Sequence, residues 1–278
     1  MSSGPHPSVA AGVSPCSVRA GTRPGQHGRS PGGAIVTGAS RGIGRTVAER
    51  VADEGVDVTI CSRDGEEIRE VAATITSEYG GECYGIECDV RDTDSVAAMV
   101  EATVERFGGV DLLVNNAGAS FMANFEDVSE NGWDSVVGVN LDGTVNCTRA
   151  ASEHLKDGGG AVVNVASVAG QQGAPYMSHY AAAKAAVINL TTSLAAEWTG
   201  DNVRINCVAP GYVATPGLES QMGISAAAID RETVDRTVGI EAEIADVVQF
   251  LASDAASFLT GETIAPKGRP QIEDTPET

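Results

Sequence analysis

From residue 33 onward, short runs of apolar residues alternate with segments in which apolar residues recur every three or four positions. Such runs predict buried strands, and the longer spacing predicts amphipathic helices. The expected strands lie at 34–38, 56–61, 83–88, 110–115, 161–167, 203–209 and 262–265. A helix is expected directly after the first strand, and further helices at 65–79, 93–107, 131–155, 179–198 and 241–252.

Strands that are apolar along their whole length, in alternation with helices, indicate a parallel sheet covered by helices on both faces. The fold class is therefore α/β, with a doubly wound parallel sheet of about seven strands. No internal repeat or linker interrupts the pattern, so we expect a single domain over residues 33–266. Residues 1–32, dense in Gly, Pro and Ser, predict a disordered leader, and residues 267–278 a polar C-terminal tail.

A glycine-rich turn with the sequence TGASRGIG spans residues 37–44, between the first strand and the first helix. Gly38, Gly42 and Gly44 permit a tight turn and a close approach of the backbone to a ligand. The N-terminus of the following helix can then receive the charge of a pyrophosphate. At this place between strand and helix the triplet indicates a dinucleotide site, and a turn without a ligand is the alternative.

The residues after the second strand bear on which dinucleotide is bound. An acidic residue here would bond the ribose hydroxyls of NAD, but Ser62 occupies the place and Arg63 follows it. Arg63 and Arg41, which lies in the glycine turn, could hold a 2′-phosphate. We therefore expect NADP(H) in preference to NAD(H), although Asp64 is near, and both arginines could instead be solvated surface charges.

The chain is strongly acidic, with 38 Asp and Glu against 18 Lys and Arg and a formal net charge of −20. This charge opposes binding to nucleic acids and to anionic membranes. Only three of the basic residues are lysines, and the acidic residues are scattered along the chain. The pattern favours adaptation to a salt-rich cytoplasm, where screening reduces self-repulsion, over an ordinary acidic protein.

The six cysteines form no C-x-x-C pair, and several lie inside apolar runs. His is too sparse to complete a plausible metal cluster, so no metal site is expected. No apolar run approaches the ~18 residues that span a bilayer, and the chain does not open with a secretory signal. We expect a cytoplasmic protein without a membrane segment.

Further motifs follow the glycine turn in a specific order. They are CDV at 88–90, NNAG at 115–118, Asn140, Ser167, YAAAK at 180–184 and PGYVAT at 210–215. With these motifs, residues 33–265 resemble the short-chain dehydrogenase/reductase family. The resemblance implies a Rossmann fold and an oxidoreductase that acts on CH–OH groups with a nicotinamide cofactor.

Tyr180 and Lys184 are spaced one helical turn apart, so their side chains share one face of the helix. A free phenol has a pKa of ~10, and a nearby ammonium would lower this pKa so that Tyr180 can exchange a proton with a substrate oxygen. Ser167 could bond the same oxygen. The resemblance further implies that Lys184 bonds the nicotinamide ribose and that Asn140 holds a water in a proton relay. His179 is expected to serve packing or to lie on the substrate side.

The remaining cofactor contacts are assigned by position in the motifs. The residues expected to bind the dinucleotide are Gly38, Ser40, Arg41, Gly42, Ile43, Gly44, Ser62, Arg63, Asp89, Val90, Asn116, Ala117, Gly118, Tyr180, Lys184, Pro210, Gly211, Val213 and Thr215. The resemblance implies that Asp89 and Val90 touch adenine and that the segment from Pro210 reaches the nicotinamide carboxamide. Asn115 is expected to brace the sheet.

The resulting hypothesis is an NADP(H)-dependent enzyme that moves hydride between nicotinamide and a ketone or secondary alcohol, most like a 3-oxoacyl-thioester reductase. A sugar or polyol dehydrogenase is one alternative, and a dinucleotide-sensing protein without catalysis is another. A lid is expected between Gly211 and about Thr237, with Tyr212, Leu218, Met222 and Ile224 as an apolar wall. The family resemblance implies a homo-oligomer, a tetramer or a dimer.

Overall fold

The computed structural model describes residues 32–269, without the side chains of Gln221 and Met222. The predicted leader apart from Gly32, most of the predicted tail, and Cys16 lie outside this range. Residues 267–269 lie against the preceding chain, since the Arg269 N–H donates to the Arg236 carbonyl over 3.0 Å.

Seven parallel strands form the central sheet, as the apolar runs predict. In chain order they are β1 (Gly33–Thr37), β2 (Val58–Ser62), β3 (Cys83–Glu87), β4 (Val110–Asn115), β5 (Ala161–Val165), β6 (Arg204–Val208) and β9 (Thr263–Ile264). Their spatial order is β3-β2-β1-β4-β5-β6-β9. The order reverses between β1 and β4, and in such sheets ligands bind beyond the carboxyl ends of the strands at this point.

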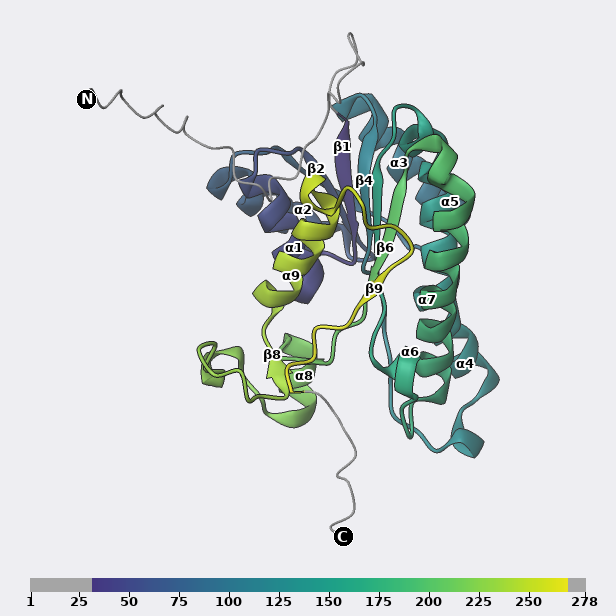
Figure 1. Cartoon of the computed structure of the whole chain (residues 1–278), viewed down its shortest axis with the longest axis vertical. Coiled ribbons are helices and arrows are strands. Elements are labelled where there is room, and N and C mark those ends of the chain that lie inside the picture. Colours follow the sequence, from purple (N-terminus) through teal and green to yellow (C-terminus); the bar gives the residue numbers. More distant parts are fainter. Residues whose placement is uncertain (1–31, 270–278) are drawn as a thin grey trace, which may run out of the picture.

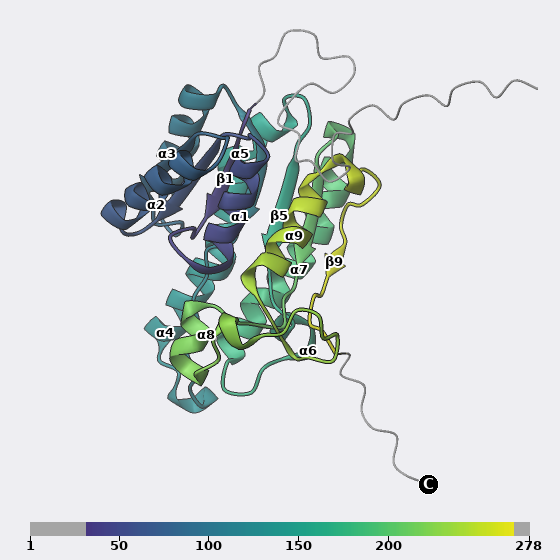
Figure 2. The ribbon, with the colours of Figure 1, turned by 90° about the vertical axis from the view of Figure 1, so that its left-hand side faces the viewer.

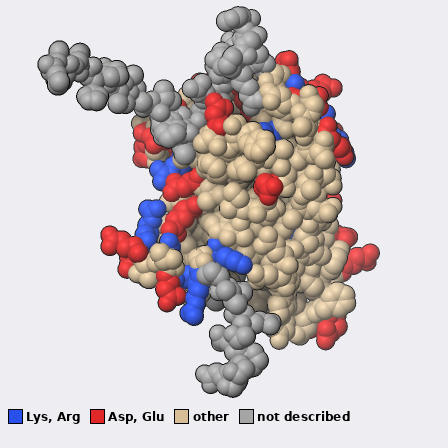
Figure 3. Space-filling model, in the orientation of Figure 1, with Lys and Arg blue, Asp and Glu red and all other residues tan. Residues whose placement is uncertain are grey.

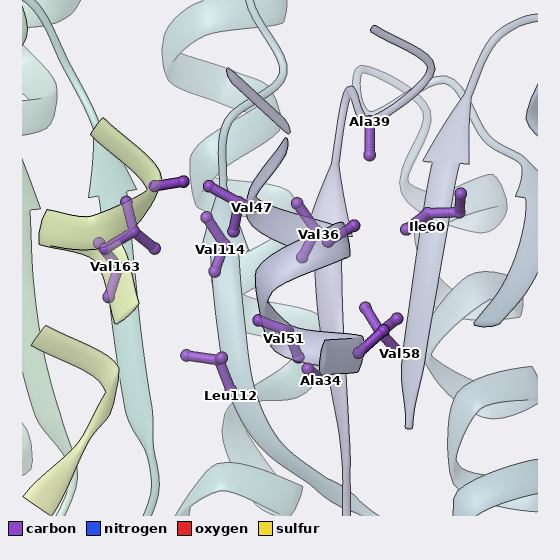
Figure 4. Close-up of a cluster of buried hydrophobic side chains, with 14 of the residues drawn as sticks. Ala34, Val36, Ala39, Val47, Val51, Val58, Ile60, Leu112, Val114 and Val163 are labelled. Atoms are coloured by element: carbon purple, nitrogen blue, oxygen red, sulfur yellow. The ribbon is translucent and has the colours of Figure 1, made fainter. Parts of the chain in front are cut away.

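Helices cover both faces of the sheet (Figure 1). One face carries α1 (Gly42–Asp53), α2 (Gly65–Glu78) and α9 (Glu241–Ala252), and the other carries α3 (Thr93–Phe107), α5 (Gly143–Lys156) and α7 (Ser178–Trp198). On the first face, Val47 and Val51 of α1 pack over Val36 of β1 and Val114 of β4 (Figure 4). The single doubly wound α/β domain predicted from the sequence is confirmed.

A smaller set of elements lies beyond the carboxyl ends of the strands (Figures 1 and 2). It comprises α4 (Glu130–Val137), α6 (Ala169–Gln172), α8 (Pro216–Met222) and the two-stranded parallel sheet of β7 (Tyr212–Val213) and β8 (Val238–Gly239). The predicted lid segment thus contains a helix, and β7 and β8 tie its two ends together. In this segment Leu218 and Ile224 are half-buried, whereas Tyr212 is 58% exposed.

The helix predicted over 131–155 consists of three parts. Between α4 and α5, residues Gly138–Asp142 form a π-helical turn. A π-turn inside a helix adds one residue to a turn and is found frequently at functional sites. Asn140 lies in this turn and is fully buried.

Candidate active site

The glycine turn holds two of its glycines in a left-handed backbone conformation, with φ of 64° at Gly38 and 66° at Gly42. A Cβ on Gly38 would lie only 2.7 Å from the Ala117 Cα, and one on Gly44 only 2.3 Å from Asn116 Nδ2. These contacts join the turn to the segment that follows β4. Only glycine fits at either position, because no side chain has room there.

Hydrogen bonds fix this junction between the turn and the segment after β4. The Thr37 hydroxyl accepts from the N–H groups of Asn116 and Ala117, each over 3.0 Å. Asn116 Nδ2 donates to the carbonyls of Thr37 and Gly38. Asn115 braces the sheet as expected, since its Nδ2 donates to Asn164 and Thr148.

The N-terminus of α1 is open to an anion. Arg41 is exposed and precedes the helix without a side-chain cap, and no acidic residue lies in the first turn. Ser40 and Ile43, on either side of the helix start, are half-buried. Backbone N–H groups at such an uncapped N-terminus, together with the helix dipole, favour a phosphate.

A cavity of about 490 Å³ lies beside the ends of β2 and β3, lined by Arg63, Glu87, Asp89, Asp92 and Ser95. Arg91 donates to the Asp89 carboxylate over 2.9 Å, and this bond, assisted by the charge of Arg63, lowers the pKa of Asp89. Val90, next along the chain, is buried. The cavity thus contains the exposed guanidinium of Arg63 near the residue expected to meet adenine.

Both polar neighbours of Arg63 make hydrogen bonds within the chain. The Ser62 hydroxyl donates to the Asp64 carbonyl over 2.9 Å. The Asp64 carboxylate caps α2 by accepting from the N–H groups of Glu66 and Glu67. Asp64, which left the cofactor preference open in the sequence, is therefore engaged as a helix cap.

The four residues predicted to be catalytic lie near the carboxyl ends of the strands. Ser167 follows β5, Tyr180 and Lys184 lie in the first two turns of α7, and Asn140 lies in the π-turn. Lys184 Nζ lies 5.6 Å from the centre of the Tyr180 ring and donates to the Val165 carbonyl over 2.7 Å. The common helix face predicted from the spacing therefore brings the two side chains together.

Gly118 lies between Asn140 and Lys184. From the point where a Gly118 Cβ would stand, Asn140 Oδ1 is 2.6 Å away and Lys184 Nζ 3.5 Å away. Asn140 Nδ2 donates to the carbonyls of Ala119 and Val136. Its Oδ1 is buried and has no hydrogen-bond partner among the described residues. A bridging water can satisfy such an acceptor beside an ammonium.

Burial shifts the proton affinities of this group. It raises the pKa of Tyr180 above its usual value, and the contact with the Ser167 hydroxyl only partly opposes it. Burial also lowers the pKa of Lys184 to about 8. The pKa of Tyr180 is thus shifted in the direction opposite to the expectation that Lys184 lowers it, because burial disfavours the phenolate.

The segment after β6 reaches back to the glycine turn. Pro210 is buried, its carbonyl accepts from the Val168 N–H, and the Gly211 N–H donates to the Pro266 carbonyl. Val213 belongs to β7, and the Thr215 hydroxyl caps α8 by accepting from Leu218 N. Thr215 Cγ2 lies 3.9 Å from the point where a Gly42 Cβ would stand. The structure thus places this segment opposite the start of α1.

Two polar side chains near the site were not assigned a function from the sequence. His179, expected to serve packing or to lie on the substrate side, is fully buried against Phe121, with ring centres 4.3 Å apart. The other is Glu241, the first residue of α9. Its Oε1 lies 3.7 Å from the point where a Gly42 Cβ would stand. No local signal marks Glu241, because the contact depends on how α9 packs against α1.

Metal-binding clusters and membrane-spanning helices were both sought in the described part of the chain. Between residues 32 and 269, no cluster of three or more His, Cys, Asp or Glu side chains is placed to hold a metal ion. None of the helices in that range is both long enough and apolar enough to cross a bilayer.

Comparison with known proteins assigns the family. The family model described as enoyl-(acyl carrier protein) reductase matches residues 38–268. The 3-oxoacyl-(acyl-carrier-protein) reductase FabG of Staphylococcus aureus is 36% identical over 236 residues, which cover 84% of this chain and 96% of that protein. The short-chain reductase protein NovJ of Streptomyces niveus is 39% identical over 247 residues, 85% of this chain and 93% of NovJ.

A solved structure agrees with the sequence comparisons. A short-chain type dehydrogenase/reductase from Mycobacterium marinum superposes with a TM-score of 0.78 at 31% identity, covering 86% of this chain and 95% of that one. The similarity therefore extends over the central sheet, the helices that cover it and the candidate active site. The chain belongs to the short-chain dehydrogenase/reductase family and is an oxidoreductase of that family.

Proposed function

We propose that the protein is an NADP(H)-dependent enzyme that moves hydride between nicotinamide and a ketone or secondary alcohol. The observation that carries this proposal is the convergence of Tyr180, Ser167, Lys184 and Asn140 at the sheet edge that also holds the glycine turn. A phenol, a hydroxyl and an ammonium at one place can bind and protonate a carbonyl oxygen. A dinucleotide sensor would have no need of this group.

The residues of the turn fit a dinucleotide. Gly38 and Gly44 leave no room for a Cβ, and the start of α1 is uncapped, so a diphosphate could approach the backbone closely. Arg63 in the neighbouring cavity supports NADP(H), because its exposed guanidinium can pair with a 2′-phosphate. Asp64 does not compete, since its carboxylate caps α2.

The bound nicotinamide would supply or accept the hydride, and the side chains of this chain would manage the proton. In reduction, the Tyr180 hydroxyl gives its proton to the carbonyl oxygen while Ser167 donates a hydrogen bond to it. The Lys184 ammonium stabilises the phenolate that remains. Asn140 Oδ1, through a bridging water, connects this group to a proton source.

The Tyr180 hydroxyl is suited to the role of proton donor that reduction requires. Its raised pKa keeps the hydroxyl protonated at neutral pH. Reduction needs a proton donor, whereas alcohol oxidation needs a base. Two of the relatives described above are named as reductases, one of them for 3-oxoacyl groups, which favours 3-oxoacyl thioesters as the substrate class.

A substrate panel tests this function. Purified protein would be mixed with NADPH or NADH and a 3-oxoacyl thioester, a simple ketone, or, with the oxidised cofactors, a sugar or polyol, and absorbance of the reduced nicotinamide followed. We expect the fastest turnover with NADPH and the thioester. Turnover only with sugars or polyols would favour the alternative dehydrogenase. Cofactor binding without turnover of any compound would favour the sensor.

We also infer a homo-oligomer of two or four chains. The surface over α7 and β9 carries few charges, although the chain as a whole is strongly acidic (Figure 3). Depletion of charged residues is typical of the core of an interface between subunits. Light scattering coupled to size-exclusion chromatography should give a mass of two or four chains, and a monomer at micromolar concentration would contradict the inference.

A reducing cytoplasm is the proposed compartment. The five cysteines at positions 61, 83, 88, 147 and 207 are all buried as free thiols. Disulfides persist mainly in oxidising compartments, so buried free thiols support a reducing one. The proposal predicts that the activity survives millimolar dithiothreitol unchanged.

A further inference from the structure

Glu241 is the first residue of α9, and α9 runs beside α1 (Figures 1 and 2). Its Oε1 lies 3.7 Å, and Thr215 Cγ2 3.9 Å, from the point where a Gly42 Cβ would stand. A carboxylate therefore stands beside the helix start that is open to an anion.

No ion pair joins the Glu241 carboxylate to a basic side chain of residues 32–269. Its Oε1 is buried without a hydrogen-bond partner among the described residues, although the Thr46 hydroxyl contacts the carboxyl group. The cation closest along α1 is Arg45, and it is already paired with Glu49 over 2.9 Å. Burial and the charge of Glu49 raise the pKa of Glu241, against the weaker effects of Thr46 and Arg45.

The other charged groups on the packed elements are also engaged elsewhere. Farther along the α1–α9 contact, Arg50 pairs with Asp246 over 3.2 Å. On the other side of Glu241, Glu243 pairs with Arg236, which precedes β8. Arg41 directly precedes Gly42 and is exposed, so the ionised Glu241 carboxylate offsets a positive charge at the start of α1.

We propose that Glu241 is an affinity-determining residue for the dinucleotide, whose ionised carboxylate opposes the diphosphate at the start of α1 and whose protonated form does not. The inference rests on the dinucleotide site of the proposed function. One anion at a helix N-terminus is stabilised by the helix dipole. A second anion nearby in a partly buried place is repelled by the first, because solvent screens it poorly.

The sign of the pH effect follows from linkage. The diphosphate disfavours the ionised carboxylate, so the pKa of Glu241 is higher in the complex than in the free protein. Binding then takes up a proton at every pH between the two values. Affinity for the dinucleotide should therefore increase as the pH falls through the range in which Glu241 takes up its proton, and level off where Glu241 is protonated in both states.

The experiment compares the wild-type protein with Glu241→Gln, and with Asp246→Asn as a matched control on the same helix. Dissociation constants for NADPH and NADH would be measured by nucleotide fluorescence between about pH 5 and about pH 8. We expect Glu241→Gln to bind about tenfold more tightly at the upper pH, and the difference from the wild type to become smaller as the pH falls. Asp246→Asn should follow the wild type.

Two further readouts separate this role from a general effect on folding. Calorimetry in buffers of different ionisation enthalpy should show proton uptake on NADH binding by the wild type and none by Glu241→Gln. NADH is the probe here because the 2′-phosphate of NADPH itself titrates near pH ~6. Without nucleotide, Glu241→Gln should unfold at a higher temperature at about pH 8, since the variant lacks a half-buried carboxylate whose ionised form is disfavoured by burial.

The affinities and the proton uptake of the wild type and Glu241→Gln decide whether Glu241 has the proposed role. Equal affinities and equal proton uptake for the wild type and Glu241→Gln, or weaker binding by the variant, would overturn the role of Glu241 and leave the proposed function intact. If neither protein binds NADPH or NADH, both the inference and the proposed function are wrong. Glu241→Ala provides a second variant should Glu241→Gln fail to fold, with the same loss of proton uptake expected.

Discussion

The Tyr180 hydroxyl is the group on which proton transfer at the proposed site depends. Replacement by phenylalanine removes this hydroxyl and leaves the ring and the helix in place. We expect Tyr180→Phe to lower kcat/KM for ketone reduction by about 10³-fold, the usual contribution of a general acid. Fluorescence titration with NADPH should show affinity within about twofold of the wild type. A parallel loss of nucleotide binding would contradict the assigned role.

Lys184 should impose an upper pH limit on activity. Burial lowers the pKa of its ammonium to about 8, so the positive charge is lost as the pH rises through that value. We expect kcat/KM to be level below about pH 8 and to fall above it, as a pH–rate profile would show. An arginine keeps its positive charge in this pH range. The kcat/KM of any activity that Lys184→Arg retains should therefore not fall above about pH 8. A profile level to about pH 10 would count against the requirement for the ammonium.

Arg63 should determine the choice between the two nicotinamide cofactors. Removing a charge-assisted hydrogen bond to the 2′-phosphate should weaken NADPH binding by about tenfold or more. NADH, which lacks this phosphate, should bind Arg63→Ala about as well as the wild type. Arg149→Ala, on α5 at the opposite face of the sheet, is the matched control. An unchanged ratio of the two dissociation constants in Arg63→Ala would refute the phosphate contact.

The pairing of Tyr180 with Lys184 shows how far residue spacing can be interpreted. Four residues along a helix place two side chains on one face, and this much could be predicted. The depth of the pair and the bond from Lys184 to the Val165 carbonyl depend on β5, which packs against α7. The direction of the pKa shift of Tyr180 follows from that depth, so the sequence alone led to the opposite expectation.

At the level of elements, the glycine turn is the part least tolerant of change. Gly38→Ala would place a side chain 2.7 Å from Ala117 in a backbone conformation that favours glycine. Gly55, with φ of 77° and no atom within 4 Å of its Cβ position, is the matched control for backbone strain alone. Urea unfolding should show a loss of about 1 kcal/mol for Gly55→Ala and more than about 2 kcal/mol for Gly38→Ala.

Dinucleotide binding should separate the same two variants. Gly38→Ala should bind NADPH too weakly to measure, because the turn and the segment at Ala117 must move apart. Gly55→Ala should bind like the wild type, since Gly55 lies after α1 and away from the turn. Equal stability and equal binding of both variants would contradict the close approach at Gly38.

Elements that are long or buried were predictable, and those made by tertiary contact were not. The helix over 93–107 coincides with α3, since its apolar stripe and the Asp92 cap are local features. The π-turn around Asn140 is not visible in the spacing, because the apolar positions continue through it. Nor could β7 and β8 be expected, since each has only two residues and they pair across the whole lid.

For the molecule as a whole, the charge of −20 predicts stabilisation by salt. Repulsion between surface carboxylates extends over about 10 Å at 0.1 M salt and about 3 Å at 1 M. We expect the unfolding temperature to rise by about 5 °C between these concentrations of sodium chloride at neutral pH.

The same experiment near the isoelectric point provides the control. At about pH 4.4 the net charge vanishes, and the effect of sodium chloride should become small. Calorimetry at both pH values would check this. An unfolding temperature independent of salt at neutral pH would argue for an ordinary acidic protein instead of one adapted to a salt-rich cytoplasm.

The pairing of β7 with β8 affects how this protein could change over evolution. Residues 214–237 leave the body and return to it at one point, because Tyr212 pairs with Val238 and Val213 with Gly239. A stretch whose ends are held together can be lengthened or replaced at little cost in loop-closure entropy. New substrate preferences could thus be acquired by exchanging this stretch. The glycine turn and α7, which carries Tyr180, would keep their proposed roles in cofactor binding and proton transfer.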